Sequence, residues 1–164
     1  MKTLIVCTSV SHGNTKKVAD TMATTLNAEV VAPDAVTATD LLGYDLIGFG
    51  SGIFTRKFHP ALVHLIEGLP QFPGTKAFVF ATSGFPDKGR TRFSRPLVTL
   101  LEQKGFNVQD TFSCRALDTF LPFKPFGGIR KSHPTPADLH AAQSFANHLR
   151  TRLTTDPSGS SARS

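Results

Sequence analysis

Tryptophan is absent from this chain of 164 residues, tyrosine occurs once and cysteine only twice. The cysteines, Cys7 and Cys114, form no CxxC pair, and no cluster of cysteine and histidine has the spacing of metal ligands. A zinc site therefore has no support in the sequence. We expect two reduced thiols rather than a disulfide, each near the end of a strand and at least one of them buried.

Apolar runs of about 20 residues are also absent, which excludes a helix that spans a membrane. The N-terminus enters a short apolar run, residues 4–7, which is too short for the apolar core of a signal peptide. A cytoplasmic location is the expectation. The length suits one domain, which we place at residues 1–153, followed by a tail at 154–164 that we expect to be disordered.

Acidic residues are too few to balance the basic ones, so the net charge is +6 and the pI about 9.7. Such a charge suits nucleic acid, an acidic protein partner or an anionic small molecule. Nucleic acid is disfavoured, because the basic residues form no recognition helix and do not alternate with aromatic residues as on a base-stacking platform.

Short apolar runs alternate with amphipathic stretches along the chain. The apolar runs predict five strands, at residues 4–7, 28–32, 45–50, 76–81 and 106–114. Helical spacing predicts helices at 14–26 and 59–68, a short one near 39–42, one with Gly105 as its C-cap, and a last one with Thr135 as its N-cap.

Strands that alternate with helices require a parallel sheet, because parallel neighbours need crossover connections. Right-handed crossovers then produce a doubly wound α/β fold of three layers, with helices on both faces of the sheet. Ligands bind such sheets beyond the carboxyl ends of the strands. The function therefore depends on the segments that follow the strands.

The segment after the first strand, residues 8–15 (TSVSHGNT), leads directly into a helix. Backbone N–H groups and the positive end of the helix dipole favour a phosphate there, and Ser9, Ser11, Asn14 and Thr15 add hydrogen-bond donors. The spacing is neither that of a Walker A loop nor GxGxxG. Taken alone, the segment is explained equally well as a helix capped by Asn14.

Two further segments follow the third and fourth strands. Residues 48–54 (GFGSGIF) carry three alternate glycines, which permit close approach of a flat ligand or unusual φ angles. An ordinary turn would need only one glycine. Residues 81–90 combine small hydroxyl residues, glycine and Phe85, which alone is more typical of a surface loop.

Together, these three segments resemble those of the flavodoxin family. TSVSHGNT is similar to the family's phosphate signature, especially in short members with an S-x-x-HGNT loop, and GFGSGIF and FATSG resemble the two loops that enclose the flavin ring. The resemblance covers roughly residues 3–150. It implies a flavodoxin-like five-stranded sheet of order 2-1-3-4-5, with FMN as the cofactor.

The resemblance also implies which residues hold the cofactor. The phosphate would be surrounded by Ser9, Ser11, His12, Gly13, Asn14 and Thr15, one side of the flavin by Gly50, Ser51, Gly52, Ile53 and Phe54, and the other side by Thr82, Ser83, Gly84 and Phe85. Gly52 is the candidate for a backbone contact with flavin N5. Because FMN itself carries the electrons, no catalytic side chain or metal is expected, and the other histidines are expected at the surface or as caps.

The chain departs from the family in charge and in aromatic content. Family members that act as free electron carriers are typically acidic around the flavin and often stack Trp or Tyr on it, whereas here Phe54 and Phe85 would replace those rings. Three windows, 51–59, 83–95 and 119–134, hold nine basic residues against Asp87 alone: Arg56, Lys57, Lys88, Arg90, Arg92, Arg95, Lys124, Arg130 and Lys131. We expect a basic rim that steers an acidic protein partner or an anionic substrate.

The segment at 115–133 is long for a connection between a strand and a helix. It is too apolar for a solvated linker, which leaves two interpretations: a loop that packs over a sheet edge, or a lid or docking surface beside the flavin.

The leading interpretation is an FMN-binding electron-transfer protein that serves a redox partner protein with an acidic docking face. The alternative is an FMN-dependent NAD(P)H oxidoreductase that acts on a quinone or another small acceptor. A third class, a binding domain that has lost its flavin, is disfavoured by the intact first segment.

Overall fold

The computed structural model of the chain describes residues 1–10, 13–84, 87, 92–115 and 134–155. Its elements are, in order, β1 (Thr3–Thr8), α1 (Asn14–Leu26), β2 (Glu29–Val31), the 3-10 helix η1 (Pro33–Ala35), α2 (Ala38–Leu41), β3 (Leu46–Phe54), β4 (Lys57–Phe58), α3 (Pro60–Gly68), β5 (Lys76–Ser83), α4 (Ser94–Gln103), β6 (Asn107–Arg115) and α5 (Pro136–Thr155).

Five strands form a parallel sheet in the order β2-β1-β3-β5-β6, and the two-residue β4 pairs antiparallel with the end of β3. With β4 set aside, this order is the predicted 2-1-3-4-5. The doubly wound α/β architecture is confirmed.

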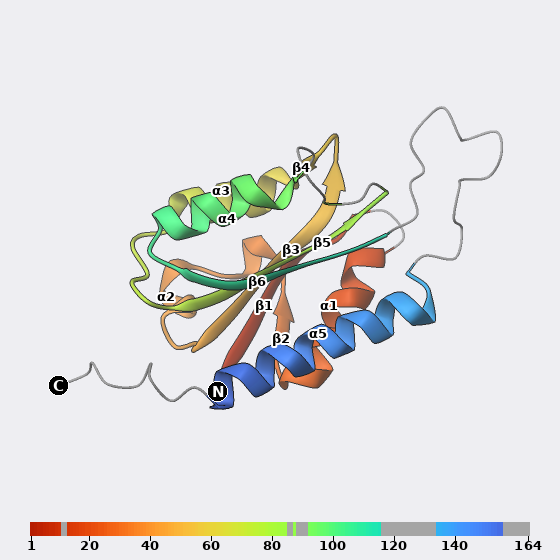
Figure 1. The fold of residues 1–164 in the computed structure, drawn as a ribbon. Coiled ribbons are helices and arrows are strands. Elements are labelled where there is room, and N and C mark those ends of the chain that lie inside the picture. Colours follow the sequence, from red (N-terminus) through yellow and green to blue (C-terminus); the bar gives the residue numbers. More distant parts are fainter. Residues whose placement is uncertain (11–12, 85–86, 88–91, 116–133, 156–164) are drawn as a thin grey trace.

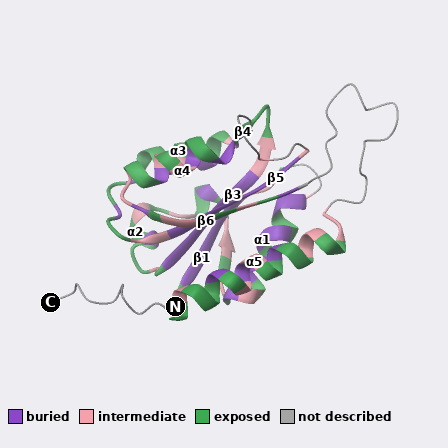
Figure 2. Ribbon diagram, in the orientation of Figure 1, coloured by how far each residue is buried: buried purple, intermediate pink, exposed green. Residues whose placement is uncertain are grey.

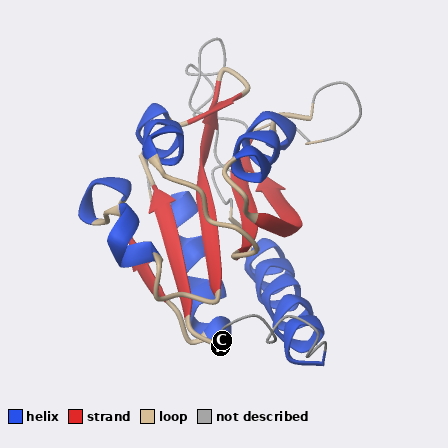
Figure 3. Ribbon diagram, turned by 90° about the vertical axis from the view of Figure 1, so that its left-hand side faces the viewer, coloured by secondary structure: helices blue, strands red, loops and turns tan. Residues whose placement is uncertain are grey.

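Helices cover both faces of the sheet, with α1 and α5 on one face and α3 and α4 on the other (Figures 1 and 3). The side chains of β1 alternate between the two faces of the sheet, so this strand contributes to the core on each side. Leu4 and Val6 pack into the core with α3 and α4, while Ile5 and Cys7 pack into the core with α1 and α5. The central strands are consequently buried on both faces (Figure 2).

The sequence predicts the capping residues of two helices, and the structure can be compared with both predictions. Thr135 caps α5, because its Oγ1 accepts from the backbone N–H of Asp138 at 3.2 Å and its own N–H donates to the Asp138 carboxylate at 2.8 Å. Gly105, predicted as the C-cap of α4, follows the actual cap Lys104 and adopts the left-handed conformation with φ 87°. Helix α5 continues to Thr155, two residues past the expected boundary at 153, and residues 156–164 lie outside the described residues.

The third strand was predicted at residues 45–50 with a loop after it, and this predicted end of the strand is wrong. Strand β3 continues through this segment to Phe54 and then turns back into β4, with Ile53 opposite Phe58 and Phe54 opposite Lys57. Strand β5 likewise extends to Ser83, beyond the predicted end at residue 81. The second and third candidate segments therefore begin as paired strands, which fixes their backbones.

Candidate functional site

The three candidate segments meet at the carboxyl edge of the sheet. Thr8 at the end of β1 lies opposite Ser51 of β3, and Gly52 of β3 lies opposite Thr82 of β5. In a parallel sheet, neighbouring strands end at the same edge, so the register brings segments from three parts of the sequence together. This edge of an open α/β sheet is where ligands bind.

A direct contact joins the first and third segments. The Oγ1 atoms of Thr15, in the first turn of α1, and Thr82, near the end of β5, lie 2.7 Å apart and form a buried hydrogen bond. Gly52 completes the group, since a Cβ atom added there would lie 3.4 Å from Thr15 Oγ1 and 3.8 Å from Thr82 Oγ1. Three residues predicted from separate segments are thus held together on the face that α1 covers.

The N-terminus of α1 is left open for an anion. Its N-cap is Gly13, which has φ 66° and provides no side-chain cap, and the first turn contains no acidic residue. The alternative that Asn14 merely caps this helix is wrong, because Asn14 is the first residue of the helix and is buried. N–H groups of this first turn that receive no bond from the N-cap side chain are donors for a phosphate or carboxylate at the positive end of the helix dipole.

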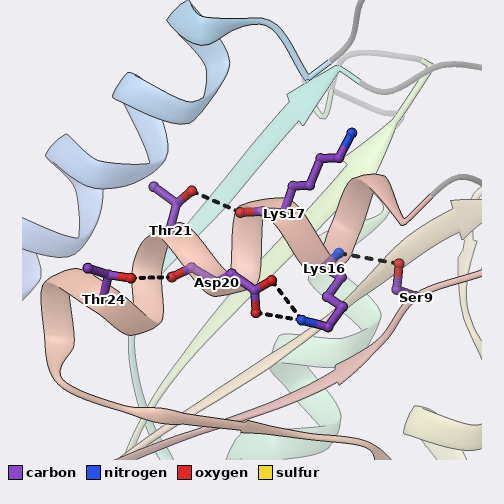
Figure 4. Close-up of polar contacts among 6 residues, drawn as sticks. All are labelled: Ser9, Lys16, Lys17, Asp20, Thr21 and Thr24. Atoms are coloured by element: carbon purple, nitrogen blue, oxygen red, sulfur yellow. Dashed lines mark hydrogen bonds and ion pairs between the residues drawn. The ribbon is translucent and has the colours of Figure 1, made fainter.

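Figure 4 shows how the surroundings of this helix end are arranged. The backbone N–H of Lys16 donates to Ser9 Oγ at 3.3 Å, so Ser9 folds back over the first turn of α1. The Lys16 ammonium group lies along the helix instead, where it pairs with both carboxylate oxygens of Asp20 at 2.9 and 2.7 Å. In this arrangement the helix end offers mainly backbone amides and hydroxyls, rather than the Lys16 charge.

Thr8 adds a polar atom that sequence reasoning missed as a site residue. Its Oγ1 is buried and has no hydrogen-bond partner in the described part of the chain. Burying a hydroxyl without a partner costs free energy, so a ligand that accepts or donates there would be favoured. Alternation along β1 places Thr8 on the side of Leu4 and Val6, which α3 and α4 cover, so it lies on the opposite face of the sheet from Thr15 and Thr82. Thr3 Oγ1, at the other end of β1, is buried without a partner in the same way, so this feature alone does not indicate a ligand.

The glycines of β3 serve packing rather than unusual backbone angles. Cβ atoms at Gly48 and Gly50 would overlap the rings of Phe78 and Phe80, which lie across the glycines from β5. Neither they nor Gly52 is among the described glycines with positive φ. The missing side chain of Gly50 makes room for the ring of Phe80, so a glycine at this position is explained without a ligand.

The rest of the second segment divides between the interior and the surface. The Ser51 side chain is fully buried, and its Oγ accepts from the N–H of His59 at 3.0 Å and donates to the carbonyl of Gly52 at 2.8 Å. Its hydroxyl therefore ties the hairpin to the start of α3. Ile53 packs against the core, whereas Phe54 is 66% exposed.

In the third segment, Thr82 and Ser83 are buried in β5 and Gly84 is half-buried just beyond it. The remaining predicted site residues, Ser11, His12 and Phe85, lie outside the described residues. Of the segment at 115–133, predicted as either a loop over a sheet edge or a lid or docking surface, only Arg115 at the end of β6 is among the described residues.

The thiols and His59 have structural roles. Cys7 and Cys114 are free and buried, as expected, and lie on strands separated by β3 and β5, about 14 Å apart at the usual strand spacing. Burial raises the pKa of both thiols to about 12, which keeps them protonated and unreactive. His59 caps α3 through Nδ1, which accepts from the N–H of Ala61 at 3.1 Å.

Four residues of the predicted basic rim are described, namely Arg56, Lys57, Arg92 and Arg95, and all are exposed. The acidic residue of the rim, Asp87, accepts a hydrogen bond from the N–H of Ser94 at 3.4 Å, at the start of α4. Lys88, Arg90, Lys124, Arg130 and Lys131 lie outside the described residues. Within the described part, no group of three or more His, Cys, Asp or Glu side chains is arranged to hold a metal ion.

Comparisons with known proteins agree with this geometry. The sequence pattern of the flavodoxin domain matches residues 5–116. An uncharacterized protein of Methanocaldococcus jannaschii is 39% identical over 149 residues, which cover 91% of this chain and 98% of that protein.

Solved structures show the same fold. A flavodoxin from the domain Archaea superposes with a TM-score of 0.66 at 17% identity, covering 94% of this chain and 99% of that one. General stress protein 14 of Treponema denticola, solved in complex with FMN, has a TM-score of 0.61 at 12% identity and covers 94% and 99% of the two chains.

The chain therefore belongs to the flavodoxin family, whose fold binds flavin and serves electron transfer. Among the described residues, no helix combines the length and apolar character that crossing a membrane requires.

Proposed function

We propose that this protein binds FMN at the carboxyl edge of its sheet and transfers electrons to or from a redox partner protein. The observation that carries the proposal is the joining of Thr15, Gly52 and Thr82 beside a helix N-terminus whose N-cap, Gly13, provides no side-chain cap.

The residues at this edge fit the two ends of FMN. Ser9, Gly13, Asn14 and Thr15, with Ser11 and His12, would hold the phosphate through hydroxyls and helix amides. The ring would lie between the end of β3, residues 50–54, and the end of β5 with the residues after it, 82–85. Because the Gly50 and Ser51 positions are used by internal packing and hydrogen bonds, we assign them a role in holding Gly52 and Phe54 in place.

FMN supplies the redox chemistry when it is bound, and the protein's contribution is to position it and set its surroundings. The buried thiols are protonated and lie in the core, so they take no part in this proposal. The partner would be a protein with an acidic docking face, and we place the reaction in the cytoplasm.

Substitutions at Ser9 test the phosphate site without weakening the fold. An aspartate at Ser9 would accept the same N–H bond from Lys16 and favour the helix dipole, so stability should be kept. Its charge would repel a phosphate, so we expect Ser9→Asp to weaken FMN binding about a hundredfold or more. Ser9→Asn is the neutral control, because asparagine has the shape of aspartate without its charge, and its FMN affinity should fall much less.

Riboflavin, which lacks the phosphate, separates the two parts of the site. Ser9→Asp should bind riboflavin as wild type does, measured by quenching of flavin fluorescence. Equal FMN affinity in Ser9→Asp and Ser9→Asn would contradict the placement of the phosphate at α1.

The exposed cations near the site favour one other function, an oxidoreductase that takes electrons from NAD(P)H. Arg56, Lys57, Arg92 and Arg95 would attract the phosphates of a nicotinamide cofactor. Steady-state oxidation of NAD(P)H by the FMN-loaded protein, with a quinone as acceptor, distinguishes the two. A carrier should show negligible turnover without a partner protein, whereas an enzyme should turn over repeatedly.

A further inference from the structure

The hairpin between β3 and β4 retains backbone strain. Its loop has two residues, Thr55 with φ 48° and Arg56 with φ 61°, as in a type I′ turn. Such turns favour Asn-Gly, and positive φ is particularly unfavourable for a β-branched residue such as Thr55. Strain of this kind tends to persist at functional sites.

This hairpin is fixed against the start of α4. The buried ring of Phe58 lies 6.4 Å from the ring of Phe93, centroid to centroid, in an edge-on contact. Arg92 directly precedes Phe93 and Arg95 follows it by two residues, while Lys57 directly precedes Phe58. The ring contact therefore brings the start of α4, with its two arginines, next to β4 and the turn that carries Arg56. We call these four cations, together with the exposed Phe54, the basic hairpin surface.

Cations on this surface lack the internal partners that most other described cations have. Elsewhere, Lys16 pairs with Asp20, Arg152 with Asp110, Arg150 and Lys104 donate to backbone carbonyls, and Lys2 lies over the Tyr44 ring. None of the four charged side chains has an ion pair or a side-chain hydrogen bond within the described part of the chain.

The nearby acid does not neutralise this group. Asp87 is directed to the N–H of Ser94 at the start of α4, and β3 and β4 contribute no acidic residue. Exposed cations without a side-chain partner among the described residues leave a positive field for an external anion.

We propose that the basic hairpin surface is the docking site for the acidic face of an electron-transfer protein, an inference that rests on the proposed function. Charge complementarity requires a negative charge on the docking face of the partner. The exposed Phe54 supplies an apolar contact of the type that recurs in protein interfaces. A nucleic acid fits less well, because base stacking uses several aromatic platforms and Phe54 is the one aromatic residue among the exposed large apolar side chains of the described chain. The surface adjoins the end of β3, so a docked partner would lie next to the proposed flavin.

Two substitutions remove charge from this surface without weakening the fold. Arg56→Gly places glycine where φ is 61°, which relieves strain. Arg95→Glu places an acid in the first turn of α4, which contains none, where it complements the helix dipole. Lys76→Gln is the control, because it also removes one charge but lies at the start of β5, at the opposite edge of the sheet.

The probes are a synthetic helical peptide with one glutamate face and one leucine face, polyglutamate, and single-stranded DNA, all of equal charge. We expect the amphipathic peptide to bind the full-length protein most tightly, with salt weakening the binding. Arg56→Gly should weaken it about three- to fivefold and Arg95→Glu about tenfold, while Lys76→Gln should leave it unchanged.

Unchanged peptide binding in Arg56→Gly and Arg95→Glu would overturn the proposal, as would equal loss in Lys76→Gln. Tighter binding of the DNA, with the same dependence on Arg56 and Arg95, would overturn it in favour of a nucleic-acid surface. FMN binding is measured on the same variants and should be retained. If wild type fails to bind FMN while peptide binding still depends on Arg56 and Arg95, the proposed function fails and the docking surface stands.

Discussion

The hydroxyl oxygens of Thr15 and Thr82 lie 2.7 Å apart, although the two residues are 67 positions apart in the sequence. The bond joins the first turn of α1 to the end of β5 and is buried from solvent. It therefore fixes the open helix N-terminus relative to the strands that would enclose a flavin ring. A cofactor that spans the helix N-terminus and the strand ends would bind more tightly if the separation of these two regions is fixed beforehand, because less ordering is then needed on binding.

Removing one hydroxyl of this pair should destabilise the protein by leaving the other buried without a partner. We expect Thr15→Val and Thr82→Val each to lower the free energy of unfolding by about 1–3 kcal/mol, measured by urea denaturation. The double variant should lose less than the sum of the two. Thr21→Val is the control, since its hydroxyl donates to the Lys17 carbonyl on the helix surface, and its effect should stay within about 0.5 kcal/mol. Additive losses would show that the two hydroxyls do not interact.

Alanine at Gly50 should be much more damaging than alanine at Gly52. A Cβ at Gly50 would overlap the ring of Phe80, so we expect Gly50→Ala to cost about 1–3 kcal/mol or more in urea denaturation. At Gly52 the nearest atom is 3.4 Å away, and the substitution should cost less than about 1 kcal/mol.

A second substitution checks the cause of the Gly50 effect. Phe80→Leu shortens the ring that fills the space and should recover part of the loss when combined with Gly50→Ala. If Gly50→Ala were tolerated alone, packing would not explain this glycine.

These glycines also show where the sequence was insufficient. Glycine is depleted from strands, so the third strand was predicted to end at residue 50. It continues to Phe54 because Gly52 pairs with Thr82 of β5 and Ile53 with Phe58 of β4. The β4 hairpin was missed for a related reason: its turn residues, Thr55 and Arg56, lack the Asn-Gly pattern of a type I′ turn. Cross-strand packing of this kind depends on residues distant in sequence.

Local signals, by contrast, predicted most of the fold. Apolar runs and helical spacing located the five parallel strands and the helices, and the Thr135 cap was identified from neighbouring residues alone. At the site, the parallel topology predicted that three strand ends would meet. It could not predict that Ser51 is used internally or that the Thr15 and Thr82 hydroxyls bond to each other, because both contacts depend on the strand register.

Relieving the strained turn should stabilise the protein. Thr55→Asn keeps every charge and introduces a residue that tolerates positive φ, so thermal unfolding should show a gain of about 0.5–1 kcal/mol. Thr25→Asn, at a helical position of α1, is a matched change without this benefit and should not stabilise. A loss of stability in Thr55→Asn would mean that the threonine makes an interaction that outweighs its strain.

Stability should fall at alkaline pH because of the two thiols. Burial raises the pKa of Cys7 and Cys114 from 9.0 to about 12 in the folded protein, so above about pH 9 the unfolded chain loses thiol protons that the native state keeps. Stability from this source is complete below pH 9 and is lost as pH rises toward 12, by about 1.4 kcal/mol per pH unit per thiol. Cys7→Ala and Cys114→Ala should each reduce the slope of unfolding free energy against pH. An unchanged slope in both would contradict the burial of ionisable thiols.

The central claim, that this chain is an FMN protein, is tested most directly by its visible absorption spectrum. The purified full-length protein is mixed with FMN, excess flavin is removed, and the flavin retained is measured against protein concentration. We expect flavin bands at about one FMN per chain, as one site at one sheet edge requires. A protein that retains no flavin after this treatment would keep its flavodoxin fold but contradict the proposed function.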